Sequence, residues 1–168
     1  MLIAGIDPGA NGAIAVLDSK NPDSVALLDL KKNSIIDIYN WLENERTRKR
    51  KKWPSRKYHS FGKIWVEDVH SMYGMSAKSN FGFGRNLGTI LAIAELIAWK
   101  SPNTVTPKIW QKYIGVTAKG KAVKKQVAKI AQYLYPQAEL HGKRGGLLDG
   151  RSDALMIAHY GLHNKEKV

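Results

Sequence analysis

Four carboxylates stand at positions where the neighbouring residues give them no evident partner. Asp7 ends an apolar stretch at the start of the chain, and Glu67 lies near the acidic end of a second one, KIWVED. Asp149 and Asp153 are four residues apart, so in a helix both would face the same way. An ionised carboxylate in or beside a buried strand is costly unless a cation, a hydrogen-bond network or a metal accompanies it. These four acids are therefore the first candidates for chemistry.

A divalent metal is the simplest explanation for acids that gather in a chain with few of them. The chain has 27 Lys and Arg against 14 Asp and Glu, which gives a net charge of +13. Clustered carboxylates repel one another, and Mg²⁺ or Mn²⁺, which take oxygen ligands, would offset that repulsion. Two such ions about 4 Å apart activate a water and stabilise the leaving oxygen at a phosphodiester.

Each acid also has a local explanation that needs no metal. Asp7 precedes Pro8-Gly9, and such a sequence is ordinary turn chemistry. Asp149 could cap the N-terminus of a helix, and Asp153 could complement the helix dipole. These alternatives stay open on the sequence alone.

The overall composition indicates a nucleic-acid partner. With 168 residues and 43% hydrophobic content, we expect one domain spanning residues 1–168. The pI near 9.9 favours a polyanionic partner, nucleic acid before membrane, because no basic amphipathic helix with a bulky apolar face stands out. The absence of cysteine excludes disulfides and thiolate metal sites. Without a basic leader or an apolar run of membrane-spanning length, we expect a cytoplasmic protein with no signal peptide.

The first part of the chain predicts three antiparallel strands and a helix. Met1–Asp18 is predicted to form a β-hairpin, and Ser24–Leu30 adds a third strand. Ser34 opens a helix with Asp37 in a capping-box arrangement. The predicted apolar face of that helix comprises Ile35, Ile38, Tyr39 and Leu42. Arg46–Lys57 then holds eight basic residues and no acid, so it is either a solvated loop or a loop that binds phosphates without sequence preference.

The middle of the chain predicts two more strands and an unusually apolar helix. Lys63–Asp68 is the fourth strand, and Asn103–Thr106 is a short fifth one. Val69–Arg85 has three glycines, two methionines and three aromatic residues, which predicts a functional loop. Asn86–Lys100 is a predicted helix with apolar residues on nearly all sides. Such a helix is covered by another element or by a second copy of the chain.

The last third of the chain is basic and helical. Leu96–Ala138 contains eight lysines and no acid, and within it Ala122–Leu134 has helical periodicity. Lysines at four-residue steps, Lys121, Lys125 and Lys129, are either a solubilising surface or phosphate contacts, and the lack of compensating glutamates favours phosphate. Gly142–Gly146 predicts a flexible basic loop, and Ala154–His163 a final helix. This order of elements predicts a mixed sheet flanked by helices.

Three motifs in this order resemble those of the RuvC-type Holliday junction resolvases of the RNase H-like superfamily. They are GIDPG at Gly5–Gly9, VED at Val66–Asp68 and SDALMIAHYG at Ser152–Gly161. FGFGRNLG and the segment TPKIWQKYIGV, Thr106–Val116, resemble the phage and organellar branch. The resemblance implies an α/β RNase H-like fold with a five-stranded mixed sheet. It also implies a homodimer that resolves four-way DNA junctions by paired nicks, with two Mg²⁺ or Mn²⁺ per active site.

The resemblance also assigns roles to residues. Asp7, Glu67 and Asp153 match the catalytic acids of the family, and Asp7 would bridge the two metal ions. The fourth bacterial acid lies three residues before the last, where this chain has Gly150, so Asp149 is the candidate instead. The predicted DNA-binding residues are Tyr73, Met75, Lys78, Arg85, Lys119, Lys121, Lys124, Lys125, Lys129, Lys143 and Arg144.

Tyr73 and Met75 are predicted to enter the open centre of the junction, as architectural proteins insert side chains between base steps. Their alternative is to pack against the core of their own domain.

Other functions remain compatible with these residues. A module of the same fold could recognise branched DNA without cutting it, and a related nuclease could cut RNA/DNA hybrids. The sugar-kinase and actin superfamily also begins with a strand and an Asp-Gly turn, but its members need a second similar domain. We expect no small-molecule cofactor and no membrane partner. If the protein is phage-encoded, we expect it in the host bacterial cytoplasm.

Overall fold

The computed structural model of the chain describes residues 1–48, 61–69, 74 and 76–164. Most of the basic segment Arg46–Lys57 lies outside these residues, and so do Tyr73 and Met75.

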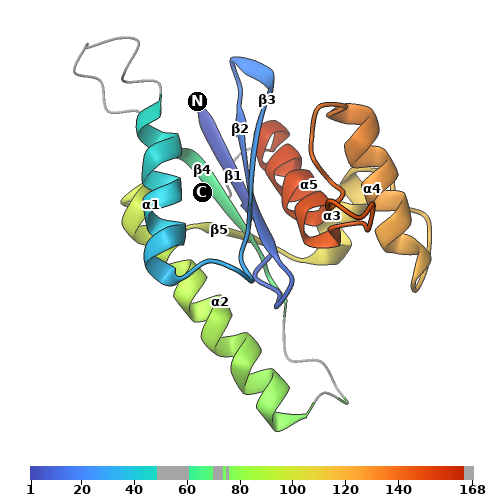
Figure 1. Cartoon of the computed structure of the whole chain (residues 1–168), viewed down its shortest axis with the longest axis horizontal. Coiled ribbons are helices and arrows are strands. Elements are labelled where there is room, and N and C mark those ends of the chain that lie inside the picture. The colour runs from blue at the N-terminus through green and yellow to red at the C-terminus, as the bar shows by residue number, and fades with distance from the viewer. Residues whose placement is uncertain (49–60, 70–73, 75, 165–168) are drawn as a thin grey trace.

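A mixed sheet of five strands forms the centre of the protein, as predicted (Figure 1). Its strand order is β3-β2-β1-β4-β5. The strands are β1 (Leu2–Ile6), β2 (Ala13–Asp18), β3 (Asn21–Asp29), β4 (Phe61–Glu67) and β5 (Asn103–Val105). β1 pairs antiparallel with β2 and parallel with β4, and β4 pairs parallel with β5. The central strands β1 and β2 are buried on both faces, which explains their nearly continuous apolar sequences.

Helices cover both faces of the sheet (Figure 1). α1 (Ile35–Thr47) and α2 (Ala77–Ala98) lie on one face. α3 (Pro107–Tyr113), α4 (Ala122–Leu134) and α5 (Asp149–His163) lie on the other. Alternate residues of β1 serve the two layers: Ile3 packs with α5, and Ala4 packs with α2. Gly5 lets α5 approach closely, because a side chain there would overlap main-chain atoms of Ala154 and Ala158.

The predicted loop Val69–Arg85 is wrong over its second half, because residues 77–85 are helical. α2 begins at Ala77, and the Ser76 hydroxyl caps it by accepting a hydrogen bond from the Ser79 amide at 3.1 Å. Glycine in a helix interior costs roughly 0.5–1 kcal/mol, so Gly82 and Gly84 suggested a loop. The cap and the apolar residues further along are consistent with a single helix nevertheless.

One further helix and one further helix boundary differ from the prediction. α3 was not predicted, because Pro107 was interpreted as the end of a strand and not as the first residue of a helix, a position that proline favours. α5 begins at Asp149 and not at Ala154, so both acids of that segment are helical.

The helix α1 confirms the predicted capping box. The Asp37 amide donates to the Ser34 hydroxyl at 3.2 Å, and the Asp37 carboxylate accepts from the Ser34 amide at 2.9 Å. Only half of the predicted apolar face is buried, since Ile38 and Leu42 are in the core and Ile35 and Tyr39 are exposed.

The helix α2 has two unlike halves. Its buried residues lie between Ile90 and Ala98, and none lies before Ile90. Figure 1 shows the N-terminal part extending beyond the sheet. By length and composition alone α2 could cross a membrane, contrary to the expectation from the sequence, and 28% of its most apolar window is buried inside the protein. The buried residues pack on the sheet, so they cannot also face lipid.

Candidate active site

The parallel pairing of β1 and β4 places Asp7 and Glu67 at the same level of the sheet. Ile6 of β1 is in register with Val66 of β4, and Asp7 and Glu67 are the residues that follow them in the sequence. The Asp7 side chain accepts a hydrogen bond from the Gly9 amide at 2.8 Å, and the Asp7 amide donates to the Ala13 carbonyl at 3.0 Å. The turn explanation for Asp7 is therefore correct, and it orients the acid beside Glu67.

The start of α5 is held against the turn between β1 and β2. Gly12 and Gly150 form an isolated bridge, and a side chain at Gly150 would overlap the Asn11 carbonyl. The Arg151 guanidinium binds the Asp29 carboxylate at 2.6 and 2.9 Å, which ties the first turn of α5 to the end of β3. These contacts bring the α5 acids to the edge that carries Asp7.

Asp149 is not the N-cap of α5. It is the first helical residue, and Leu148 occupies the cap position without a side-chain hydrogen bond. Its charge lies in the first turn, where it complements the helix dipole.

Burial and the charges of neighbouring acids raise the pKa values of Asp7, Glu67 and Asp153. Burial raises the pKa of Asp7, and burial together with the Asp7 charge raises the pKa of Glu67 to about 7. Burial raises the pKa of Asp153 to about 8, with further contributions from Asp7, Glu67 and Asp149. The acids at the ends of β1 and β4 and at the start of α5 are therefore close enough to repel one another.

Two further residues contact these acids. The Trp110 indole, fully buried in α3, donates a hydrogen bond to Glu67 Oε1 at 2.9 Å. Lys124 of α4, predicted to bind DNA, forms an ion pair with Asp149, and this bond raises the pKa of the lysine. The role of Trp110 was not predicted, because α3 was missed and its contact with β4 spans 43 residues. Its only signal was the motif TPKIW.

The four acids have the chemistry of a site for hard divalent cations, since carboxylate oxygens are the ligands that such ions take. Repulsion between desolvated carboxylates is the cost that a bound cation would offset. Within the described part of the chain, however, no three acidic or histidine side chains converge closely enough to hold an ion as they stand. The chemistry of the four acids therefore fits a metal ion. In this structure the Lys124 ammonium supplies the positive charge beside Asp149.

A groove of about 510 Å³ lies next to the turn that carries Asp7. It is lined by the β1–β2 turn, the start of α1 and the middle of α2. Lys31 and Arg85 contribute positive charge to it, so the predicted DNA-binding residue Arg85 lines a groove that includes the turn next to Asp7.

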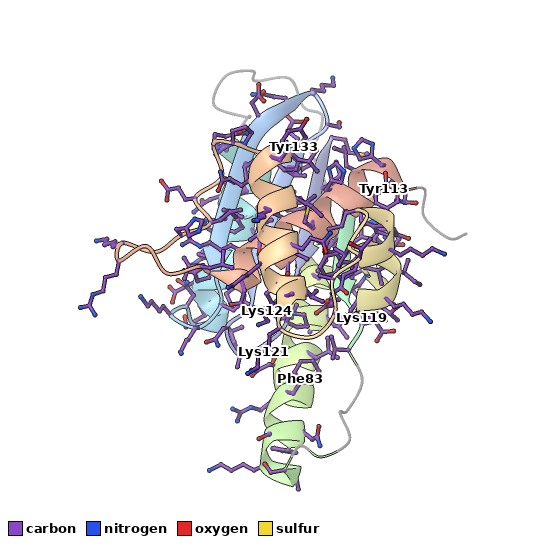
Figure 2. All side chains as sticks on the ribbon, turned by 90° about the vertical axis from the view of Figure 1, so that its right-hand side faces the viewer. Phe83, Tyr113, Lys119, Lys121, Lys124 and Tyr133 are labelled. Carbon is purple, nitrogen blue, oxygen red and sulfur yellow. The ribbon has the colours of Figure 1, made fainter. Side chains whose placement is uncertain are left out.

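Within the described part of the chain, the other predicted DNA-binding residues lie on exposed surfaces. Lys78 is on the protruding part of α2, and Lys143 and Arg144 are in a turn closed by the Gly142 amide and the Gly146 carbonyl at 2.8 Å. Figure 2 shows Lys119, Lys121 and Lys124 at one end of α4. Lys125 and Lys129 are exposed along the same helix.

The solved structures that this chain resembles include two of RuvC from Thermus thermophilus. The structure of RuvC in complex with Holliday junction substrate has a TM-score of 0.55 over 94% of this chain and 90% of that chain, at 15% identity. The other RuvC structure has a TM-score of 0.50, with 96% and 95% coverage and 17% identity. No family model and no curated protein matches the sequence. At these identities the similarity shows the fold, and it confirms the predicted RNase H-like architecture.

Proposed function

We propose that this chain, which has the fold of RuvC, is a metal-dependent endonuclease that cuts branched DNA, with four-way junctions as its preferred substrate. One observation carries the proposal: in a chain of net charge +13, the acid that follows β1 and the acids of β4 and α5 lie at one edge of the sheet, close enough to raise the pKa of Asp153. The protein resembles a structure in which RuvC is bound to a Holliday junction.

The residues of the site have separable roles in this proposal. Asp7, Glu67, Asp149 and Asp153 would hold two Mg²⁺ or Mn²⁺, which when bound supply an activated water and stabilise the leaving oxygen. The hydrogen bond from the Gly9 amide fixes the Asp7 carboxylate, and the Trp110 indole orients Glu67 by its hydrogen bond at 2.9 Å. Lys124 holds Asp149 by an ion pair. The lysines of α4 and the loop pair Lys143 and Arg144 would position the phosphates.

A homodimer is part of the proposal, because paired nicks need two active sites at a fixed separation. The surface that supports it is the solvent face of α2, where Leu96 and Phe81 are 67% and 75% exposed. Next to it, Trp99 is 87% exposed at the end of the helix. These large apolar side chains are spaced along one helix, and their exposure supports the proposed interface.

A second candidate is a module that binds branched DNA without cutting it. The observation in its favour is that the acids do not converge on a common point and that Asp149 is paired with Lys124.

A substrate comparison separates these functions. A labelled four-way junction, a linear duplex and an RNA/DNA hybrid are incubated with the protein and Mg²⁺ or EDTA, and the products are analysed on denaturing gels. The proposal expects paired nicks in the junction, with Mg²⁺ only, by a protein of dimer mass in gel filtration. Binding without cleavage in Mg²⁺ and Mn²⁺ would support the module, and preferential cleavage of the hybrid would indicate a ribonuclease.

A further inference from the structure

A second concave surface lies between α3, α4 and α5, beyond the acids. Its volume is about 560 Å³, and its lining residues are Tyr113, Ile114, Lys129, Ile130, Tyr133, Leu134 and His159. We call it the tyrosine groove. Tyr133 is 84% exposed and Tyr113 is 45% exposed. Beneath them the Tyr135 hydroxyl and His159 Nδ1 share a hydrogen bond at 2.8 Å, so the polar groups below the groove already have partners.

The two tyrosines of the groove are held differently. The Tyr113 ring packs edge-on against Tyr160 at 5.4 Å, and Tyr160 packs edge-on against the buried Trp65 at 5.1 Å. The Tyr113 ring is therefore held in place by packing on one side of the groove. The Tyr133 ring, which also lines the groove, is largely exposed to solvent.

The helix α4 connects the acids to the groove. Lys124, near its start, contacts Asp149, and Tyr135, just past its end, contacts His159. Lys121, Lys125 and Lys129 follow one another at four-residue steps, and Tyr133 is the next residue in this series. Each step advances by roughly 6 Å along the helix. Figure 2 shows Lys121 at one end of α4 and Tyr133 at the other.

We propose that the tyrosine groove seats unpaired bases of a nucleic-acid strand whose phosphates follow the lysine series of α4. Aromatic side chains beside a cationic track are how proteins bind single strands, because every base has a face that stacks. The sequence from residue 96 to 138 has no acid, so nothing on this segment repels phosphate.

The charge of the surface favours nucleic acid over the other occupants. A second copy packed here by two-fold symmetry would place its own line of lysines against this one, and like charges repel. A purely apolar peptide would leave Lys129 in the groove without a partner. The proposal does not depend on cleavage, since a strand can bind at the groove whether or not the acids act.

Binding of a fluorescent oligothymidine of about 12 nucleotides tests the proposal, within the site sizes typical of single-strand binding. Tyr133→Ala should weaken binding by roughly five-fold or more, because one stacked base is lost. Tyr133→Phe, which keeps the ring, should bind within about two-fold of wild type. Tyr39→Ala removes an exposed tyrosine on the opposite face of the sheet and should change nothing.

Two further measurements distinguish stacking from other contacts. Tyr133→Leu should bind as weakly as Tyr133→Ala, because leucine is apolar but does not stack in this way. Lys129→Ala should lower the slope of log affinity against log salt by about 0.7, whereas Tyr133→Ala should leave the slope unchanged.

Several outcomes would overturn the proposal. Wild-type affinity in Tyr133→Ala would remove the groove from strand binding, and wild-type affinity in Tyr133→Leu would show apolar docking. A dimer that becomes a monomer in Tyr133→Ala would identify the groove as an interface between copies. A wild-type protein that binds oligothymidine through Tyr133 but cuts no junction would keep the groove and contradict only the proposed nuclease.

Discussion

The acid-bearing edge of the sheet and the first half of α2, residues 77–89, both contain several glycines, but these glycines have opposite surroundings. Around the acids, a side chain at Gly5 or Gly150 would overlap main-chain atoms of a neighbouring element. In the first half of α2, a side chain at Gly82, Gly84 or Gly88 would meet no atom within 4 Å. Packing within the chain therefore requires glycine at the positions around the acids, and it does not require glycine in the first half of α2.

This difference separates what the protein needs to fold from what it presents to others. The acids, buried or half-buried, lie on elements tied together by the β1–β4 register, the Gly12–Gly150 bridge and the Arg151–Asp29 ion pair. No residue in the first half of α2 is buried, and its glycines lower helix stability without a gain inside the chain. We expect that half to make its close contacts with a partner, the second protomer or DNA.

The largest effect is expected from Asp7→Asn. Cleavage should fall by more than roughly 100-fold, because even outer-shell partners of metal sites are typically worth 10–100-fold. Junction binding should stay intact or tighten, because one charge that repels phosphate is removed. Single-turnover cleavage and a gel-shift titration measure the two effects, with Asp23→Asn, an exposed acid of β3, as control. Cleavage near the wild-type rate would remove Asp7 from the site.

The variant Gly5→Ala should destabilise the protein by about 1–3 kcal/mol, because the new methyl group would displace α5 from β1. The matched variant Gly84→Ala should instead stabilise the monomer by about 0.5–1 kcal/mol, because alanine favours the helix and has open space around it. Urea unfolding of both variants tests the comparison. If Gly5→Ala raises the free energy of unfolding, or Gly84→Ala lowers it, the distinction between the two groups of glycines is wrong.

A third prediction concerns the dimer. The sequence of α2 is apolar on nearly all sides from residue 86 to 100, but in the structure Ile93 is buried on the sheet and Leu96 is exposed. Ile93→Asp should therefore unfold the chain, whereas Leu96→Asp should keep monomer stability within about 0.5 kcal/mol. Sedimentation should show Leu96→Asp as a folded monomer that cleaves junctions poorly. If it stays dimeric and active, another surface forms the dimer.

The smallest effect is expected from single lysines. Lys125→Ala should lower the slope of log junction affinity against log salt by about 0.9, because one phosphate contact is lost. It should also reduce cleavage at saturating protein, since binding energy that aligns the scissile phosphate acts on rate. Arg48→Ala, at the end of α1, should lower the slope and spare the saturated rate. Equal effects of both variants on the saturated rate would contradict this division of the basic residues.

Elements with strong periodicity were predictable from the sequence. β1, β2 and α4 were expected close to their observed bounds, because alternating or helical apolar patterns determine which face is buried. The beginnings of α2 and α5 were missed because Gly82, Gly84 and Gly150 lower local helix propensity, and tertiary packing and capping outweigh propensity.

The candidate site was predictable only in part. Asp7 and Glu67 could be paired from the sequence, because parallel strands end at the same edge of a sheet. The Lys124–Asp149 ion pair and the Trp110–Glu67 hydrogen bond join segments 25 and 43 residues apart, and no local pattern indicates such contacts. The same limit applies to the tyrosine groove, whose walls come from three helices.

The proposed nuclease depends most on metal binding by the four acids, which do not converge on a common point in the structure. Titration of Mn²⁺ into the wild-type protein, followed by calorimetry and by electron paramagnetic resonance, tests this claim without any DNA. We expect about two ions per chain in wild type and a loss of this binding in Asp7→Asn, with Asp23→Asn unchanged. Wild-type protein that binds no Mn²⁺, or Asp7→Asn that binds it equally well, would contradict the proposed metal site.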